Sequence, residues 1–193
     1  MKGMKKTGAR ISLLISIIII GTAWLAGCSR KNVDPVSRSS FLLNTFITVT
    51  LYDSQDETIL DGCMELCSDY EKLLSKTLEG SEIYQMNHRK AGERTFTVSG
   101  GTARVLQKGL EYSRISEGAF DITIEPLSTL WDFTGKDPQV PRPDEIQKDL
   151  KKVGYDNVTL DGNQVTFSND ETTIDLGAIA KGFIADEMKA YLK

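Results

Sequence analysis

Hydrophobic residues recur at helical spacing along one long stretch of the chain. Between residues 59 and 74 they return at steps of three and four, which places them on one wide face of an α-helix because 3.6 residues make one turn. This face holds Ile59, Leu60, Cys63, Met64, Leu66, Cys67, Tyr70, Leu73 and Leu74. The sequence "SQDE" at 54–57 fits a capping box in which Ser54 caps the helix and Glu57 reaches back. We therefore expect the helix to begin just after Ser54.

Alternating and β-branched residues predict strands on both sides of this helix. The segment "FLLNTFITVTLYD" at 41–53 predicts one strand, and "RTFTV" at 94–98 predicts another. Two alternating runs at 157–167 flank Asp161-Gly162, a dipeptide that is typical of two-residue hairpin turns. Residues 157–167 therefore predict a β-hairpin.

Three further segments predict helices. Ser81 is expected to cap a short helix, residues 100–116 predict a second long helix, and residues 144–154 predict a short amphipathic one. Between Pro126 and Pro143 the periodicity weakens and further glycine and proline residues occur. We expect a long surface segment there rather than regular structure.

The last part of the chain predicts a strand, "TTIDL" at 172–176, followed by a helix that runs to Tyr191. Strands and helices mix along the chain without strict βαβ alternation, which favours an α+β fold with a mixed or antiparallel sheet and flanking helices. The final helix has no later strand to cover, and the hairpin needs neighbouring strands. We therefore expect the C-terminal part of the fold to lie beyond this chain.

The beginning of the chain has the pattern of an export signal. Residues 1–10 carry four basic residues and no acid, and an uncharged run follows from Ile11 to Ser29. This run is long enough to cross a membrane, so an uncleaved anchor is the alternative. The sequence "LAGC" at 25–28 resembles a bacterial lipobox, which favours lipidation of Cys28 and cleavage just before it.

We accordingly expect a signal peptide at 1–27, a polar tether at 28–40 and a folded body at 41–193, held at the cell membrane on its extracytoplasmic side. The 193 residues are 40% hydrophobic and 26% charged, which suits one globular domain. Removal of the signal peptide takes four of the 23 basic residues and none of the 27 acids, which leaves a net charge of −8. Nucleic-acid binding normally needs a basic surface, so this balance argues against a nucleic-acid partner.

The remaining cysteines, Cys63 and Cys67, share a face of the predicted helix because they lie four residues apart. The chain has a single histidine, His88, so no zinc site of the usual ligand number is visible. We favour core cysteines, although an exported compartment also permits their oxidation.

The stretch "TIDLGAIAKG" at 173–182 is the first candidate for chemistry. Asp175 ends the predicted strand, Gly177 permits close approach of a ligand to the backbone, and Lys181 adds a positive charge. A helix that starts here exposes free N–H groups, so the stretch suits an anion. The spacing is not that of a Walker loop. Taken alone, a tight packing turn with a surface lysine is the favoured interpretation.

Two other stretches offer weaker signals. In residues 116–133, Phe120 provides a flat surface for stacking a ring, and Asp121 can accept hydrogen bonds from ring or ribose donors. Residues 75–87, "SKTLEGSEIYQMN", carry hydroxyls and acids that either line a pocket or cap two helices. Each stretch in isolation favours a structural role.

These stretches occur together and in order, and in that combination the sequence resembles the ApbE-type family of FAD:protein FMN transferases. The resemblance rests on "NTF" at 44–46, on residues 75–87 and 116–133, and on "IDLGAIAKGFIAD" at 174–186. The motifs stand behind a lipobox and extend over nearly the whole predicted body. Members of this family are considerably longer, with a C-terminal half that carries further metal ligands.

The resemblance implies that the protein binds FAD and Mg²⁺, breaks the pyrophosphate and attaches FMN to a Thr or Ser hydroxyl of an exported or membrane protein. The acceptor is typically a subunit of a redox-driven ion pump. By the family pattern, the cofactor-binding residues are Leu43, Thr77, Ala119, Phe120, Asp121, Asp175 and Lys181, and the backbone carbonyl of Ala178 binds the metal. Leu43 and Thr77 depart from the Met and Tyr that are common at these positions.

No general base for the acceptor hydroxyl is identifiable, because His88 is remote from every motif. Two other functions remain open. The first is a lipoprotein that captures FAD or another nucleotide without turnover. The second is an envelope protein in which the motifs serve only the fold.

Overall fold

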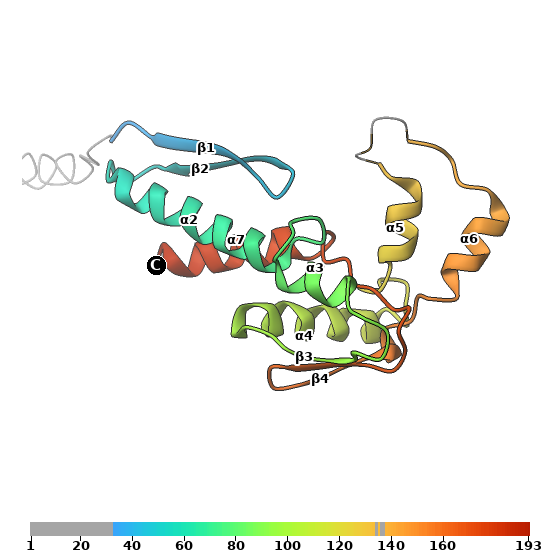
Figure 1. Ribbon diagram of the computed structural model, residues 1–193. Helices are drawn as coiled ribbons and strands as arrows, with labels where there is room; N and C mark the ends of the chain where they lie inside the picture. The colour runs from blue at the N-terminus through green and yellow to red at the C-terminus, as the bar shows by residue number, and fades with distance from the viewer. Residues whose placement is uncertain (1–32, 134, 136–137) are drawn as a thin grey trace, which may run out of the picture. The chain divides into compact units, whose positions relative to one another are not determined.

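A computed structural model describes residues 33–133, 135 and 138–193 (Figure 1). The predicted signal peptide at 1–27 and the predicted lipidation site at Cys28 lie outside the described residues. The described chain divides into two compact units, one with residues 33–36 and 51–55 and the other with residues 37–50 and 56–193. The elements described below belong to the second unit, apart from Val36 at the start of the first strand and Leu51 at the end of the second.

Strands β1 (Val36–Leu42) and β2 (Thr45–Leu51) form a two-stranded sheet. The prediction of one strand over 41–53 is wrong, because Leu43 and Asn44 turn the chain with φ angles of 53° and 56°. Asn tolerates this left-handed conformation, but Leu rarely adopts it, so the run of apolar residues gave no turn signal. Residues 36–40, which the sequence placed in the tether, belong to β1.

Helix α2 (Glu57–Leu74) carries the predicted apolar face, with Cys63 and Cys67 among its buried residues. Its N-cap is Asp56 rather than the predicted Ser54, because the Asp56 side chain accepts a hydrogen bond from the Thr58 N–H. Both cysteines are free and fully buried. Burial, together with a smaller contribution from the charge of Glu71, raises the pKa of Cys67 to about 11, which keeps it a neutral core thiol.

A second sheet contains three antiparallel strands in the order β3-β5-β4. They are β3 (Thr95–Thr97), β4 (Val158–Asp161) and β5 (Gln164–Phe167). Asp161 pairs with Gln164, so the turn of the β4–β5 hairpin is Gly162-Asn163, one residue later than predicted. The antiparallel sheets with flanking helices confirm the predicted α+β class.

The other helices are α3 (Glu82–Asn87), α4 (Gly100–Ile115), α5 (Glu125–Trp131), α6 (Pro143–Leu150), the 3-10 turn η1 (Tyr155–Asn157) and α7 (Ala180–Tyr191). Ser81 caps α3 as predicted. Helix α5 lies partly in the segment predicted to lack regular structure. Pro126 starts this helix rather than breaking it, because a proline in the first turn has no hydrogen-bonding N–H to lose. Each described helix is too short or too polar to span a bilayer.

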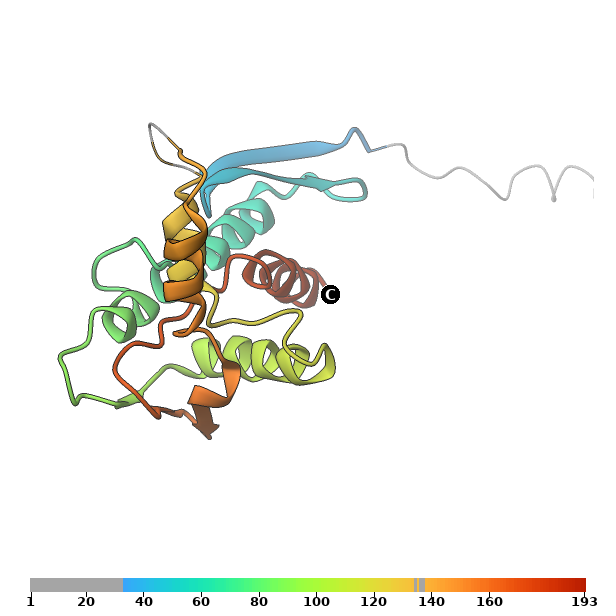
Figure 2. The same ribbon diagram turned by 90° about the vertical axis from the view of Figure 1, so that its right-hand side faces the viewer.

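The hydrophobic core is formed between α4 and the elements that pack against it. Helix α4 packs between the three-stranded sheet and the helices α2 and α7 (Figures 1 and 2). Residues 173–176 pass beside this core without joining a strand, so the prediction of a strand at 172–176 is wrong. Ile174 and Leu176 are nevertheless buried at 0% and 2% exposure. They anchor the segment from which the candidate site is built.

Gly109 of α4 lies against Ile122 in the loop after this helix, so we expect Gly109→Ala to destabilise the protein. A Cβ at position 109 would lie 2.6 Å from Cγ2 of the buried Ile122. Overpacking of this kind costs about 1–3 kcal/mol, so we expect urea denaturation to show a loss of that size. Gly100→Ala in the same helix is the control, because a Cβ there meets no atom within 4 Å. Equal stability of the two variants would contradict the packing described here.

Candidate functional site

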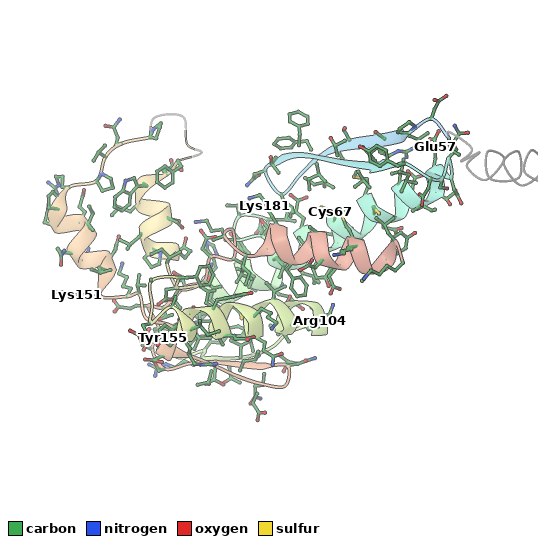
Figure 3. All side chains as sticks on the ribbon, turned by 180° about the vertical axis from the view of Figure 1, so that it is seen from behind. Glu57, Cys67, Arg104, Lys151, Tyr155 and Lys181 are labelled. Carbon is green, nitrogen blue, oxygen red and sulfur yellow. The ribbon has the colours of Figure 1, made fainter. Side chains whose placement is uncertain are left out.

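A cavity of about 510 Å³ lies where the end of α2, the end of α5, the start of α7 and the β1–β2 turn meet. Its walls contain Leu43, Asn44, Glu71, Leu74, Ser75, Lys76, Thr77, Ser128, Thr129, Asp132, Phe133, Asp175, Leu176, Gly177, Ala180 and Lys181. Figure 3 shows Lys181 at the first turn of α7. The volume falls in the range of about 300–1,000 Å³ that is usual for ligand pockets.

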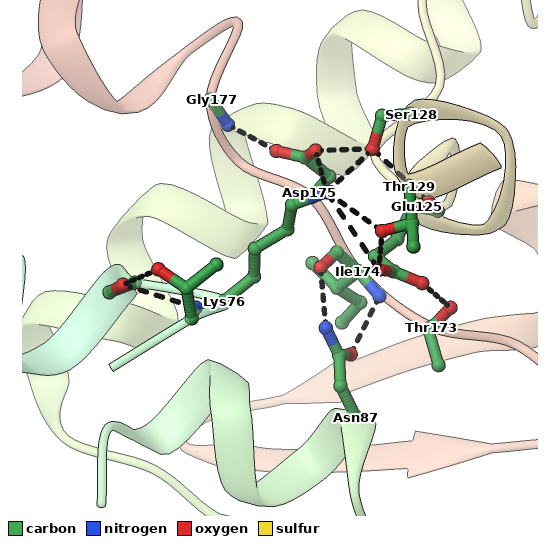
Figure 4. Close-up of polar contacts among 11 residues, drawn as sticks. Lys76, Asn87, Glu125, Ser128, Thr129, Thr173, Ile174, Asp175 and Gly177 are labelled. Carbon is green, nitrogen blue, oxygen red and sulfur yellow. Dashed lines mark hydrogen bonds and ion pairs between the residues drawn. The ribbon is translucent and has the colours of Figure 1, made fainter. Parts of the chain in front are cut away.

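Three donors converge on the carboxylate of Asp175, which lines this cavity (Figure 4). Its Oδ2 accepts a hydrogen bond of 2.6 Å from the Ser128 hydroxyl and lies 3.0 Å from the Lys76 Nζ. Its Oδ1 accepts a hydrogen bond of 2.8 Å from the Gly177 N–H. The side chain is 18% exposed. Asp175 therefore ties the end of α2 and helix α5 to the chain that enters α7.

A side-chain amide holds the residue before Asp175. The Asn87 Nδ2 donates to the Ile174 carbonyl, and the Asn87 Oδ1 accepts from the Ile174 N–H, both at 2.8 Å (Figure 4). The next N–H, of Asp175, donates to the Ile122 carbonyl at 2.8 Å. Asn87 thus supplies the two hydrogen bonds that a neighbouring strand would otherwise supply, which explains why this buried segment is extended without being a strand.

The surroundings of Asp175 set its charge. Burial raises its pKa, but the hydrogen bonds from Ser128 and Gly177 and the Lys76 ammonium outweigh burial and hold the pKa below its ordinary value of 3.8. Asp175 is consequently ionised at neutral pH.

This shift predicts a dependence of stability on pH. Because the folded pKa lies below the unfolded one, the stabilisation is complete above the ordinary value of 3.8 and is lost as the pH falls through the folded value. Urea denaturation between about pH 6 and pH 3 should therefore show a loss of free energy of unfolding in the wild type that is smaller in Asp175→Asn. Parallel pH profiles of the two proteins would contradict the assignment.

Four of the residues carried over from the family pattern meet at the cavity, namely Leu43, Thr77, Asp175 and Lys181. The Leu43 N–H donates to the Glu71 Oε1 at 2.7 Å, so the turn of the β1–β2 hairpin is fixed to α2. The contact is made by the backbone, and it does not depend on the side chain at position 43.

The structure places Ala119, Phe120 and Asp121 outside the residues that line this cavity. Asp121 uses both carboxylate oxygens within the chain, because Oδ1 accepts from the Thr123 N–H and hydroxyl at 2.8 and 2.7 Å, and Oδ2 accepts from the Tyr155 N–H at 2.9 Å. Phe120 is half-buried against the core. The carbonyl of the adjoining Ile122 accepts the hydrogen bond of the Asp175 N–H, so this segment holds the backbone of Asp175 in place.

The prediction of free N–H groups directly after Gly177 requires a correction. Helix α7 begins at Ala180, three residues later, and the Gly177 N–H is already donated to Asp175. Ala178 is exposed in the intervening turn. The glycine therefore shapes the turn around the carboxylate, and its own N–H is not available to an anion.

Sequence reasoning missed four polar residues of the site, which are Lys76, Asn87, Glu125 and Ser128. All four lie inside the stretches 75–87 and 116–133 that carried the family resemblance. Their position within those motifs was the available signal. Their roles depend on contacts across 47 to 87 residues of sequence, which no local pattern indicates.

The charged groups of the cavity wall bear on what the site can hold. Within residues 33–133, 135 and 138–193, no three His, Cys, Asp or Glu side chains gather as they would around a metal ion. The cavity wall holds three carboxylates, Glu71, Asp132 and Asp175, against two ammonium groups, Lys76 and Lys181. An anionic diphosphate would enter this wall only with added positive charge, and Mg²⁺ commonly takes few protein ligands together with phosphate oxygens.

Comparisons with known proteins agree on one family. The model of the ApbE family matches residues 43–193. An FAD:protein FMN transferase from Klebsiella pneumoniae is 33% identical over 81% of this chain and 50% of its own length. One from Haemophilus influenzae is 27% identical over 94% of this chain and 56% of its own length. The chain thus spans about half the length of the curated relatives it matches.

Solved structures show the same likeness. The ApbE protein of Thermotoga maritima matches with a TM-score of 0.74 and 27% identity, over 82% of this chain and 52% of that one. The flavin transferase ApbE of Vibrio cholerae matches with a TM-score of 0.75 and 25% identity, over 82% of this chain and 53% of its own.

Proposed function

Because the chain belongs to the ApbE family, we propose that the protein is an FAD:protein FMN transferase and that the cavity around Asp175 binds the diphosphate of FAD. In this reaction a Thr or Ser hydroxyl oxygen of an acceptor protein forms a bond to the phosphorus of the FMN moiety. The pyrophosphate P–O bond breaks, AMP leaves, and the hydroxyl proton passes to a base. The observation that carries the proposal is the convergence of Thr77, Asp175 and Lys181 on one cavity.

The residues of this chain contribute binding and orientation. Lys181 is exposed at the start of α7 and lines the cavity, which supports the role that we propose for it, to face the phosphate oxygens. Asp175 fixes the Gly177 turn and the Lys76 ammonium beside it. Transfer of a phosphoryl-type group needs charge neutralisation and positioning more than covalent help from the protein, which suits such a set. No residue of the described chain is assigned as the general base.

Mg²⁺ is part of the proposal. From this chain, the ligand would be the carbonyl of Ala178, which lies in the exposed turn after Gly177 and is not itself among the residues that line the cavity. When bound, the metal supplies positive charge that stabilises the phosphate oxygens during transfer. The remaining ligands would come from the diphosphate, from water or from parts of the protein outside this chain.

We further propose that the protein acts at the outer face of the cell membrane, tethered by a lipid on Cys28. The lipobox at 25–28 supports this location. The proposed acceptor is an exported or membrane flavoprotein, such as a subunit of a redox-driven ion pump. A lipid tether keeps the transferase next to acceptors of that kind.

The proposed function is tested by incubating the intact protein with FAD, Mg²⁺ and an acceptor protein, and by following AMP release and covalent flavin fluorescence on the acceptor. Both signals should appear with FAD and Mg²⁺ and vanish when FMN replaces FAD, because FMN has no pyrophosphate to break. FAD that stays bound and intact would instead indicate a flavin-binding lipoprotein. Absence of any FAD binding would leave the motifs with a role in the fold alone.

A further inference from the structure

We propose that the Lys76 ammonium is a built-in cation, which fills an oxygen-lined site between α2 and α5 and positions Asp175. Four oxygens surround the Lys76 Nζ. They are the Ser128 Oγ at 2.8 Å, the Asp175 Oδ2 at 3.0 Å, the Thr129 Oγ1 at 3.2 Å and the Glu125 Oε1 at 3.7 Å. Two carboxylates and two hydroxyls form the kind of oxygen set that binds a small cation.

The oxygen cage is fixed independently of Lys76. The Thr129 hydroxyl donates to the Glu125 Oε1 at 2.5 Å, and the Thr173 hydroxyl donates to the Glu125 Oε2 at 2.7 Å. Ser128 donates to Asp175 at 2.6 Å. These bonds hold the oxygens in place from α5 and from the chain before α7. Removal of the ammonium would therefore leave a preformed cavity of oxygens rather than a collapsed one.

The partial burial of the charged side chains in this site strengthens the electrostatic interactions among them. The side chains of Lys76, Glu125 and Asp175 are only 25%, 19% and 18% exposed. Without the ammonium, two half-buried carboxylates would face each other across the cage. Their repulsion is weakly screened at this depth, so a cation is needed to offset it and to keep the two carboxylates close together.

The consequence for the ligand rests on the proposed function. Lys76 cancels negative charge beside the position of the diphosphate and holds the Asp175 carboxylate in the rotamer that shapes the Gly177 turn. Lys76 is thus a positioning residue that acts through Asp175, whereas Lys181 faces the ligand. Loss of Lys76 should raise KM for FAD more than it lowers kcat.

Chemical rescue of Lys76→Ala in the intact protein tests this inference. The melting temperature should fall by roughly 4 °C, and FAD affinity should fall by about tenfold. Ammonium or potassium chloride should restore both along a saturating curve, because each ion can enter the emptied cage. Tetramethylammonium chloride at the same ionic strength should restore neither, since it is too large. The wild type should respond equally to all three salts.

Two matched variants act as controls. Lys76→Met keeps the length of the side chain and occupies the cage, so it should lose the same stability and gain nothing from ammonium. Lys72→Ala removes an exposed lysine that pairs with Asp69 at 2.8 Å, and it should show neither the loss nor the rescue. If Lys76→Ala does not fold without added salt, refolding in ammonium but not in tetramethylammonium is the expected result.

Three outcomes would overturn the inference. They are an unchanged melting temperature in Lys76→Ala, equal recovery in all salts, and rescue of Lys76→Met by ammonium. The melting temperature is measured without FAD, so it decides the cation site even if the wild type fails to bind FAD. That failure would count against the proposed function alone.

Discussion

Asp175→Asn is expected to weaken FAD binding by about a hundredfold. The carboxylate accepts from three donors, Ser128, Lys76 and Gly177, and an amide must turn its NH2 toward at least one of them. Charge-assisted hydrogen bonds contribute about 1.5–3 kcal/mol each, and 2.8 kcal/mol corresponds to about a hundredfold in Kd. Titration of the intact protein with FAD, followed by flavin fluorescence, gives the change directly.

The control for this experiment is Asp170→Asn. Asp170 is also paired with a cation, Arg94 at 2.8 Å, but it lies away from the cavity residues. Its replacement changes the net charge by the same amount and should leave the affinity for FAD unchanged. A similar loss in both variants would mean that general charge, and not the geometry around Asp175, governs binding.

Asn87→Ala is expected to destabilise the protein by about 3 kcal/mol. The substitution leaves both the N–H and the carbonyl of Ile174 without the partner that now bonds each at 2.8 Å. Ile174 is fully buried, and an unsatisfied buried polar group costs about 1–3 kcal/mol. Urea denaturation measures the loss. FAD affinity should fall as well, because Ile174 precedes Asp175.

Gln85→Ala on the same helix separates this effect from a general weakening of α3. The Gln85 side chain is exposed, and its Nε2 donates to the Gly80 carbonyl at 2.9 Å. Its loss should cost only a fraction of the loss at Asn87, since water replaces an exposed hydrogen bond. Comparable losses in the two variants would show that the Asn87 amide does not hold the Ile174 backbone.

The sequence predicted those parts of the fold that depend on local signals. The period of three and four residues along α2 located the helix and its buried face, and Ser81 located the start of α3. The β4–β5 hairpin followed from its alternating runs and glycine, with an error of one residue in the turn. In each case the residues that decide the structure lie within one or two turns of each other.

The failures have a different physical cause. The turn at Leu43 and Asn44 places a leucine in a left-handed conformation, against its own preference, and the backbone there is held by Glu71 of α2. The segment before Asp175 looks like a strand, but the side chain of Asn87, 87 residues earlier, supplies its hydrogen bonds. Contacts between distant residues decided both structures, and local patterns carry no trace of them.

The residues of the candidate site divide in the same way, into those that the sequence motifs indicated and those that only contacts between distant residues bring into the site. The family pattern led to Asp175, Lys181, Thr77 and Leu43, which the structure brings together at one cavity. It did not indicate Lys76, whose ammonium reaches α5 and Asp175 across more than 50 residues. A lysine between a serine and a threonine carries no local mark of an ion pair, so only the folded arrangement gives it a role.

The central claim, that the cavity around Asp175 holds FAD, is tested most directly by hydrogen–deuterium exchange of the intact protein with and without FAD. When FAD is bound, the amides at 75–77 and 174–181 should exchange more slowly, with no change in the β4–β5 hairpin. FAD bound under the same conditions without protection of these two segments would contradict it.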